Sequence, residues 1–226
     1  MTIDYRWRAH YETGVAHTVD IPNKTVPQLL QEAAATHPNH IAVRLVLRYL
    51  PLGLRIEAKL TYAELNGLSD RFAAALAGLG VRRGDRVALL LPNLPQQVIA
   101  YFGVLKAGAV VVNMNPTYPP YELEPLLRNA GAETVVTLSG LYARVREVQG
   151  QTALKRIILT DVAEMVAWPW RGLVAKQAAV AGLLADVPAD APVLWLKQLI
   201  ASAPAQASRV PIDPADTAIF QFTGGT

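Results

Sequence analysis

The feature that most constrains the fold is a regular alternation of short apolar runs with segments of helical periodicity. The runs are rich in Val, Ile and Leu and lack polar alternation, which is typical of strands buried on both faces of a parallel sheet. We therefore predict an α/β fold in which right-handed crossovers place helices on both faces of a mostly parallel sheet. The predicted strands are 86–91, 109–113, 134–138, 156–160 and 218–222, and the predicted helices between them are 95–107, 120–129 and 140–149.

Two capping boxes mark helix starts before this core. Thr25 is followed three residues later by Gln28, and Thr61 stands in the same relation to Glu64, a spacing that satisfies free amides at a helix N-terminus. Gly80 is placed to end the second of these helices in the left-handed conformation. Between the two helices, apolar segments at 41–47 and 55–62 surround a Pro and a Gly, and they predict a small N-terminal β-hairpin.

Residues 161–210 break the alternation. The stretch is rich in alanine and proline and holds three of the four tryptophans, so we predict helical pieces joined by turns. The predicted organisation is a lead-in over 1–24, a βα core over 25–160, this insertion over 161–210, and a strand with the start of a loop over 211–226.

Composition excludes several classes of function. The net charge is only +3 and the basic residues are scattered, so we expect no nucleic-acid partner. The chain has no cysteine, which excludes disulfides and thiolate metal sites. The N-terminus lacks the pattern of a signal peptide, and the apolar runs stop well short of the ~20 residues that a membrane helix needs. We expect a cytoplasmic protein.

The candidate binding residues follow the last predicted strand. Thr223, Gly224, Gly225 and Thr226 come directly after the apolar segment 218–222. Glycines let backbone amides approach phosphate oxygens and threonine hydroxyls add donors, although an ordinary turn has the same composition. The Gly-Lys-Ser/Thr element of a Walker loop is absent.

Three segments in order resemble the adenylate-forming superfamily, and within it the AMP-forming acyl-CoA synthetases. They are LTYAELNGLSDRFAAALAGLGVRRGDRVALLLPN (60–93), LKAGAVVVNMNPTYPPYELEPLLRNAGAETVV (105–136) and FQFTGGT (220–226). The last is similar to the first half of that superfamily's phosphate loop, and the resemblance covers roughly residues 20–226. It implies that the chain is part of the large N-terminal domain of such an enzyme and is an N-terminal fragment that ends inside the loop and is inactive alone.

The resemblance also implies a reaction. The full-length enzyme would be a long-chain fatty acid–CoA ligase that uses ATP, Mg²⁺ and CoA, with Thr223, Gly224, Gly225 and Thr226 around the ATP β- and γ-phosphates. It implies no catalytic residue within the 226 residues, since the lysines and the acidic residue of the family's chemistry would come later. The alternatives are a ligase for aryl or shorter acids, and a non-catalytic binding or homo-oligomerisation module of the same fold.

The tryptophans of the insertion allow two interpretations. Trp168, Trp170 and Trp195, with neighbouring leucines, Arg171 and Lys176, would suit peripheral contact with the inner membrane surface. The other interpretation is that these aromatic side chains pack on the sheet, as buried aromatic residues commonly do.

Other polar residues favour structural roles. His37 and His40 lack a third ligand nearby, so we expect no metal site. The charged residues of 82–86 predict a solvated turn with a local ion pair. Asn113 and Asn115 end a predicted strand where α/β proteins often bind ligands, but their side chains also suit a turn.

Overall fold

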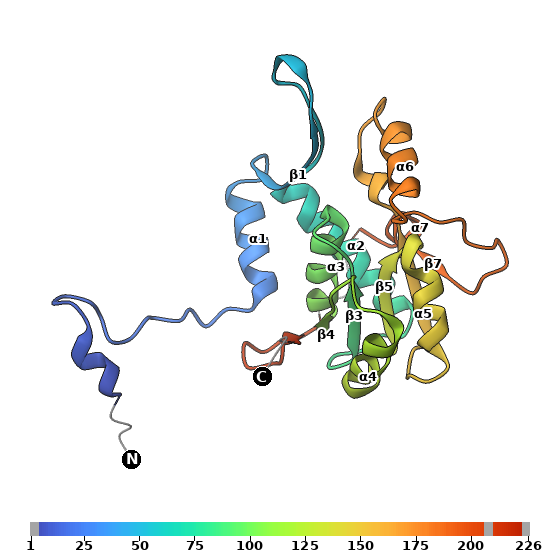
Figure 1. The fold of residues 1–226 in the computed structure, drawn as a ribbon. Coiled ribbons are helices and arrows are strands. Elements are labelled where there is room, and N and C mark those ends of the chain that lie inside the picture. Colours follow the sequence, from blue (N-terminus) through green and yellow to red (C-terminus); the bar gives the residue numbers. More distant parts are fainter. Residues whose placement is uncertain (1–4, 206–209, 223–226) are drawn as a thin grey trace.

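The protein is described by a computed structural model over residues 5–205 and 210–222 (Figure 1). A six-stranded sheet has the order β7-β6-β5-β3-β4-β8, and every strand pair in it is parallel. A separate antiparallel hairpin joins two further strands. The predicted fold class is confirmed. The strands are β1 (Ile41–Tyr49) and β2 (Arg55–Thr61) in the hairpin, and β3 (Arg86–Leu90), β4 (Val110–Asn113), β5 (Thr134–Leu138), β6 (Arg156–Thr160), β7 (Leu194–Trp195) and β8 (Ile219–Gln221) in the sheet.

Helices cover both faces of this sheet (Figure 1). Helices α1, α2, α3 and α7 contact one another in one layer, and α4 contacts α5 in the other. The helices are α1 (Val26–Thr36), α2 (Tyr62–Gly78), α3 (Pro95–Lys106), α4 (Pro120–Ala130), α5 (Tyr142–Gln149), α6 (Arg171–Val180) and α7 (Leu196–Ser202), with short 3₁₀ turns η1 (Arg6–His10), η2 (Pro51–Gly53), η3 (Ser139–Leu141) and η4 (Val162–Met165).

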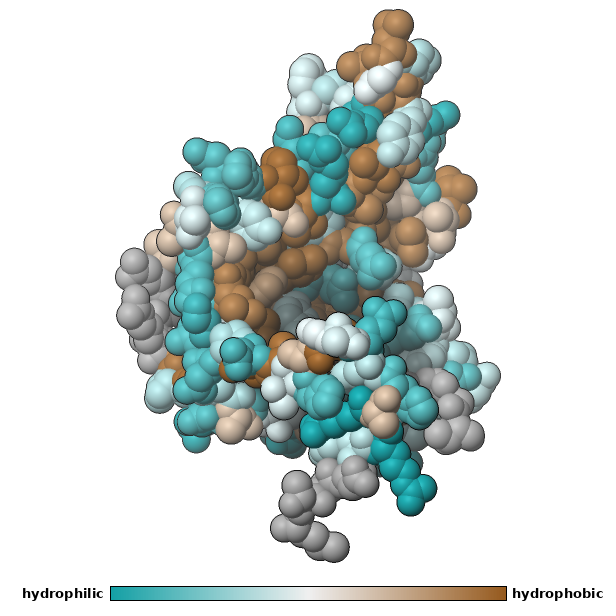
Figure 2. All heavy atoms as spheres, turned by 90° about the vertical axis from the view of Figure 1, so that its left-hand side faces the viewer, coloured by the Kyte–Doolittle hydropathy of each residue, from teal (hydrophilic) through white to brown (hydrophobic). Residues whose placement is uncertain are grey.

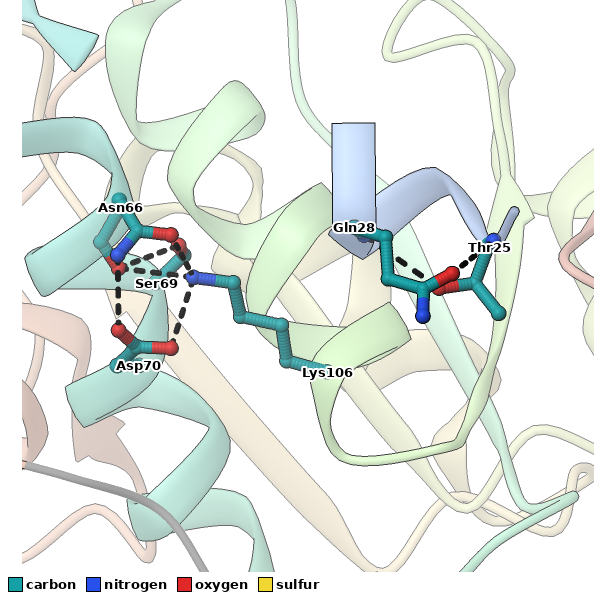
Figure 3. Close-up of polar contacts among 6 residues, drawn as sticks. All are labelled: Thr25, Gln28, Asn66, Ser69, Asp70 and Lys106. Atoms are coloured by element: carbon teal, nitrogen blue, oxygen red, sulfur yellow. Dashed lines mark hydrogen bonds and ion pairs between the residues drawn. The ribbon is translucent and has the colours of Figure 1, made fainter. Parts of the chain in front are cut away.

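Both capping boxes form as predicted. The Thr25 hydroxyl accepts a bond from the Gln28 amide, and the Gln28 side chain accepts one of 2.7 Å from the Thr25 amide (Figure 3). Thr61 and Glu64 make the reciprocal pair at the start of α2. Gly80 has a φ of +83° just after α2, which glycine adopts without steric cost. Local chemistry therefore fixes where these two helices begin and where α2 ends.

The insertion contributes one element that the sequence pattern missed. We expected only helices and turns over 161–210, but β7 lies there and pairs in parallel with β6, Leu194 beside Ile158 and Trp195 beside Leu159. A two-residue strand is too short to produce a recognisable period. Within the described part of the chain, the insertion thus supplies one end of the strand order and β8 supplies the other.

A buried lysine joins two helices of the first layer, α2 and α3. The ammonium group of Lys106, on α3, donates to the side-chain oxygen of Asn66 at 2.8 Å, to its carbonyl at 2.9 Å and to Asp70 Oδ1 at 2.8 Å, all on α2 (Figure 3). Burial lowers the pKa of Lys106, and the bond to Asp70 offsets part of that effect. This network fixes α3, whose first turn lies at the site described next.

Candidate functional site

A pocket lies where the connections of two neighbouring strands diverge. The chain leaves β3 into α3, in one helix layer, and leaves adjacent β4 into α4, in the other. Such a switch point at the carboxyl ends of parallel strands opens a crevice, and α/β proteins bind ligands there. The open pocket has a volume of about 680 Å³, and its lining residues are Leu91, Pro92, Asn93, Gln97, Asn113, Met114, Asn115, Pro116, Tyr118, Gln221 and Phe222.

The polar lining of this pocket consists mainly of amide side chains. Asn93 follows β3, Gln97 lies in the first turn of α3, Asn113 and Asn115 lie at the end of β4, and Gln221 ends β8. Among the described residues that line it, none is Asp, Glu, Lys, Arg or His. Amides donate and accept hydrogen bonds without formal charge, so the described lining is suited to hold a polar ligand.

Asn113 links the ends of two strands that are far apart in the sequence. Its side-chain amide donates to Gln221 Oε1 at 2.8 Å, and the two residues are paired in the β4–β8 register. The predicted turn role belongs instead to Asn115, whose Oδ1 accepts bonds from the Thr117 amide at 3.0 Å and the Thr117 hydroxyl at 2.8 Å. One asparagine therefore shapes the loop and the other fixes the end of β8.

An arginine from α5 supports the wall of the pocket. The guanidinium group of Arg144 donates to the carbonyl of Pro116 at 2.8 Å and to that of Tyr118 at 3.0 Å. A planar guanidinium holds two acceptors in a fixed geometry. The loop between β4 and α4 is therefore attached to the helix layer behind it.

The entry to β8 is fixed by an ion pair that differs from the one expected. Within 82–86, Asp85 Oδ2 accepts a bond from the backbone amide of Arg82. The ion pairs of the described residues do not include Asp85, so the predicted local pair of side chains is not observed. Arg83 instead contacts Asp216 at 2.6 Å. This hydrogen bond raises the pKa of Arg83 and lowers that of Asp216. The pair lies in water and adds little stability, but it fixes the position of the chain before β8.

The predicted phosphate-binding residues Thr223, Gly224, Gly225 and Thr226 lie outside the described residues. The described chain reaches Phe222, which follows β8 and lines the pocket. The sequence also gave no indication that Gln221, Asn93 and Gln97 would line the same pocket. Their position could have identified each of them as a candidate, but not as members of one pocket, because each comes at the end of a predicted buried strand or shortly after it.

A second polar cluster lies at the carboxyl ends of β5 and β6. The Ser139 hydroxyl donates a hydrogen bond to Asp161, and the Gln96 side chain donates to the backbone carbonyl of Asp161 at 2.7 Å. The Thr160 hydroxyl donates to Glu164 at 2.6 Å. Burial raises the pKa of Asp161 and of Glu164. The hydrogen bond from Ser139 offsets part of the effect on Asp161, and the one from Thr160 offsets part of the effect on Glu164.

These raised pKa values predict a pH dependence of stability. Between the ordinary values of 3.8 and 4.5 and the raised ones, the folded state binds more protons than the unfolded state. The free energy of unfolding then falls as pH rises through that window, and the loss is complete above the raised pKa values. In the double variant Asp161→Asn/Glu164→Gln, which has no carboxyl group at either position, we expect the free energy of unfolding not to show this decrease.

Urea unfolding of wild type and of the double variant from pH 4 to 8 measures how the free energy of unfolding depends on pH. Subtracting one curve from the other removes the titration of all remaining groups. A difference between the two proteins that stays constant across this range would contradict the assignment.

The tryptophan-rich segment divides between the two interpretations. Trp168 is 88% exposed, and Trp170 and Leu173 are also exposed beside Arg171 and Lys176. Trp195, in β7, is half-buried and packs against the core. Among the described residues, no helix combines the length and the apolar character needed to cross a bilayer.

Comparison with known proteins gives a consistent result. A protein family described as "AMP-binding enzyme" matches residues 30–226. A long-chain-fatty-acid–CoA ligase of Bacillus subtilis (strain 168) is 31% identical over 97% of the chain, which spans 38% of that relative. The fold is similar to that of a long-chain-fatty-acid–CoA ligase from Archaeoglobus fulgidus (TM-score 0.70, 21% identity, 92% of this chain and 36% of that one). It is also similar to that of a benzoate CoA ligase from Burkholderia xenovorans LB400 (TM-score 0.56, 22% identity, 81% of this chain and 29% of that one).

Proposed function

Because the chain belongs to the family of AMP-binding enzymes, we propose that the whole protein is an ATP-dependent acid–thiol ligase for long-chain fatty acids. The fatty carboxylate attacks the α-phosphorus of ATP and releases pyrophosphate, and the CoA thiol then displaces AMP from the acyl-adenylate. The observation that carries the proposal is the amide-lined pocket at the β3–β4 switch point, which β8 reaches just before Thr223.

The pocket suits the polyphosphate of ATP because it offers uncharged hydrogen-bond donors. Side-chain amides and threonine hydroxyls offer donors to phosphate oxygens without the desolvation of a buried charge. We assign Thr223, Gly224, Gly225 and Thr226 to the β- and γ-phosphates. No carboxylate is among the described residues that line the pocket, so these residues do not fit a Mg²⁺ site. Neutralisation of the phosphate charge, which phosphoryl transfer requires, is therefore assigned to other parts of the protein.

The choice of a fatty acid is supported by the name of the Bacillus subtilis relative. The alternative is an aryl acid, because the fold is also similar to that of a benzoate CoA ligase. ATP–pyrophosphate exchange by the full-length protein separates them. We expect exchange with palmitate and none with benzoate. Exchange with benzoate alone would show that the substrate is an aryl acid. No exchange with any acid would favour a non-catalytic module.

The loop assignment has its own test. We expect Thr223→Val and Thr226→Val each to slow exchange by at least about tenfold, because a hydrogen bond to a charged group contributes about 1.5–3 kcal/mol. Thr217→Val is the matched control, since Thr217 is exposed at the other end of β8 and should leave exchange unchanged. Equal rates for all three variants would remove the loop from the phosphate site.

The proposal also covers how the chain is divided into segments and where in the cell the protein acts. We propose a lead-in over 1–24, a βα core over 25–160, an insertion over 161–210 and a strand leading to the loop over 211–226. We also propose a cytoplasmic protein in peripheral contact with the inner membrane surface. The exposed Trp168 and Trp170 beside Arg171 support this contact, because aromatic and basic side chains favour the interface of a bilayer.

A further inference from the structure

The tip of the β1–β2 hairpin has an unusual turn. The backbone amide of Leu54 donates to the carbonyl of Pro51 at 3.4 Å, and that of Leu50 donates to the carbonyl of Leu54 at 2.8 Å. The two central residues, Leu52 and Gly53, have φ values of +61° and +74°. Positive φ at both positions is what a type I′ turn requires, and Asn-Gly is the preferred pair there.

Leucine is a costly residue at this position. A left-handed backbone costs a residue with a Cβ atom about 1–2 kcal/mol. The Leu52 side chain gains nothing from packing in return, because it is 98% exposed. Backbone strain that packing does not explain indicates a role outside the stability of the fold.

Leu52 belongs to a larger apolar surface at the tip. Leu54 is 60% exposed and Tyr49, at the end of β1, is 73% exposed. The hairpin projects from the body of the protein (Figure 1), and the top of the space-filling view, where it lies, is hydrophobic (Figure 2). The tip therefore presents apolar side chains at the end of an extended arm.

Positive charge surrounds this apolar tip. Arg48 and Arg55 flank it, and Arg44 and Lys59 lie further along the strands. The hairpin's single carboxylate, Glu57, lies 3.6–3.9 Å from the cationic groups of Arg44, Arg55 and Lys59. Four cationic side chains and one carboxylate give the hairpin a charge of +3, which equals that of the whole chain.

We propose that the hairpin tip is a lipid-contacting element that inserts its leucines into the surface of an anionic bilayer. Apolar side chains at the level of the headgroups, with arginines beside lipid phosphates, combine the two forces that hold a peripheral protein on a membrane. Helix α6 projects at the same end of the molecule (Figure 1). The inference extends the membrane contact proposed for α6 and does not depend on the ligase reaction.

The test uses the full-length protein and co-sedimentation with vesicles of phosphatidylcholine alone or with one quarter phosphatidylglycerol. Wild type should bind the anionic vesicles more strongly. Leu52→Asn should weaken that binding about tenfold, which is the effect of losing one buried leucine. It should not lower the melting temperature, because Asn-Gly suits a type I′ turn better than Leu-Gly. Val19→Asn, at a site 83% exposed in the lead-in, is the matched control and should bind as wild type does.

Several outcomes would overturn the inference. These are no binding of wild type to anionic vesicles, equal binding to both kinds of vesicle, or full binding by Leu52→Asn. A shift of Leu52→Asn from dimer to monomer in ultracentrifugation, with vesicle binding unchanged, would identify the tip as a contact between two copies. Trp168→Ser reports on α6 separately, and pyrophosphate exchange without vesicles reports on the ligase alone.

Discussion

Replacing Lys106 with methionine is expected to lower the free energy of unfolding by about 2–3 kcal/mol. Removing one partner of a buried ion pair costs about 3–5 kcal/mol when the other charge stays buried. The expected loss is smaller here, because the Asp70 side chain is 26% exposed and water reaches it. Methionine fills nearly the same volume, so the change reports the lost hydrogen bonds to Asn66 and Asp70 rather than a cavity.

The effect of Lys106→Met should depend on pH in a direction that identifies its cause. Burial lowers the pKa of Lys106 below 10.5, so above that lowered value the unfolded state binds more protons than the folded state. The stability that Lys106 confers must then rise with pH up to about 10.5. Urea unfolding of both proteins between pH 7 and 10.5 measures it. A fall in the difference would mean that attraction to Asp70 outweighs desolvation.

A second substitution provides the control for the first. In Lys106→Met/Asp70→Asn the carboxylate that has lost its partner becomes a neutral amide beside Asn66. Replacing both members of a buried pair is less costly than removing one, so the double variant should recover part of the lost stability. No recovery would show that the loss in Lys106→Met does not come from the unpaired charge.

Gly140→Ala is expected to cost about 3 kcal/mol, the upper part of the range for overpacking. Gly140 lies in η3, directly after β5. A Cβ atom there would lie 2.3 Å from the carbonyl oxygen of Gly182 and 2.6 Å from the carbonyl carbon of Leu183. Both are backbone atoms and cannot rotate away, so the segment that follows α6 must move away from the sheet.

Gly150→Ala is the matched control for this prediction. Gly150 follows the last residue of α5 with helical φ and ψ, and a Cβ atom there has no neighbour within 4 Å. Alanine at such a site should be neutral or slightly stabilising, because it restricts the unfolded chain. Urea denaturation of the two variants and wild type gives the comparison. Equal stability of Gly140→Ala and wild type would contradict the close approach of the two segments.

The sequence predicted the elements whose cause is local. The strands β3, β4, β5 and β6 are continuous apolar runs, and the capping residues Thr25 and Thr61 begin their helices as predicted. Such features depend on neighbours within about four residues. The strand β7 was not predicted, because it is a strand through its pairing with β6 and its own two residues carry no recognisable pattern.

The pocket could be predicted only in part for the same reason. The end of a buried strand indicated Asn113 and Asn115 as candidates, because ligands bind at carboxyl ends of parallel strands. No local pattern indicates that Asn113 reaches Gln221, 108 positions away, or that Arg83 reaches Asp216, 133 positions away. These residues become neighbours through the order of strands in the sheet, and the sequence pattern does not predict that order.

The position of β8 has a consequence for synthesis on the ribosome. Strands β3 to β6 all lie between residues 86 and 160, whereas β8 follows the insertion and pairs with β4. Chains emerge N-terminus first, so the centre of the sheet can form while the edge of β4 is still bare. An unpaired edge is a template for association with other chains. The nascent protein is therefore most open to aggregation, and to chaperones, in the interval before β8 emerges.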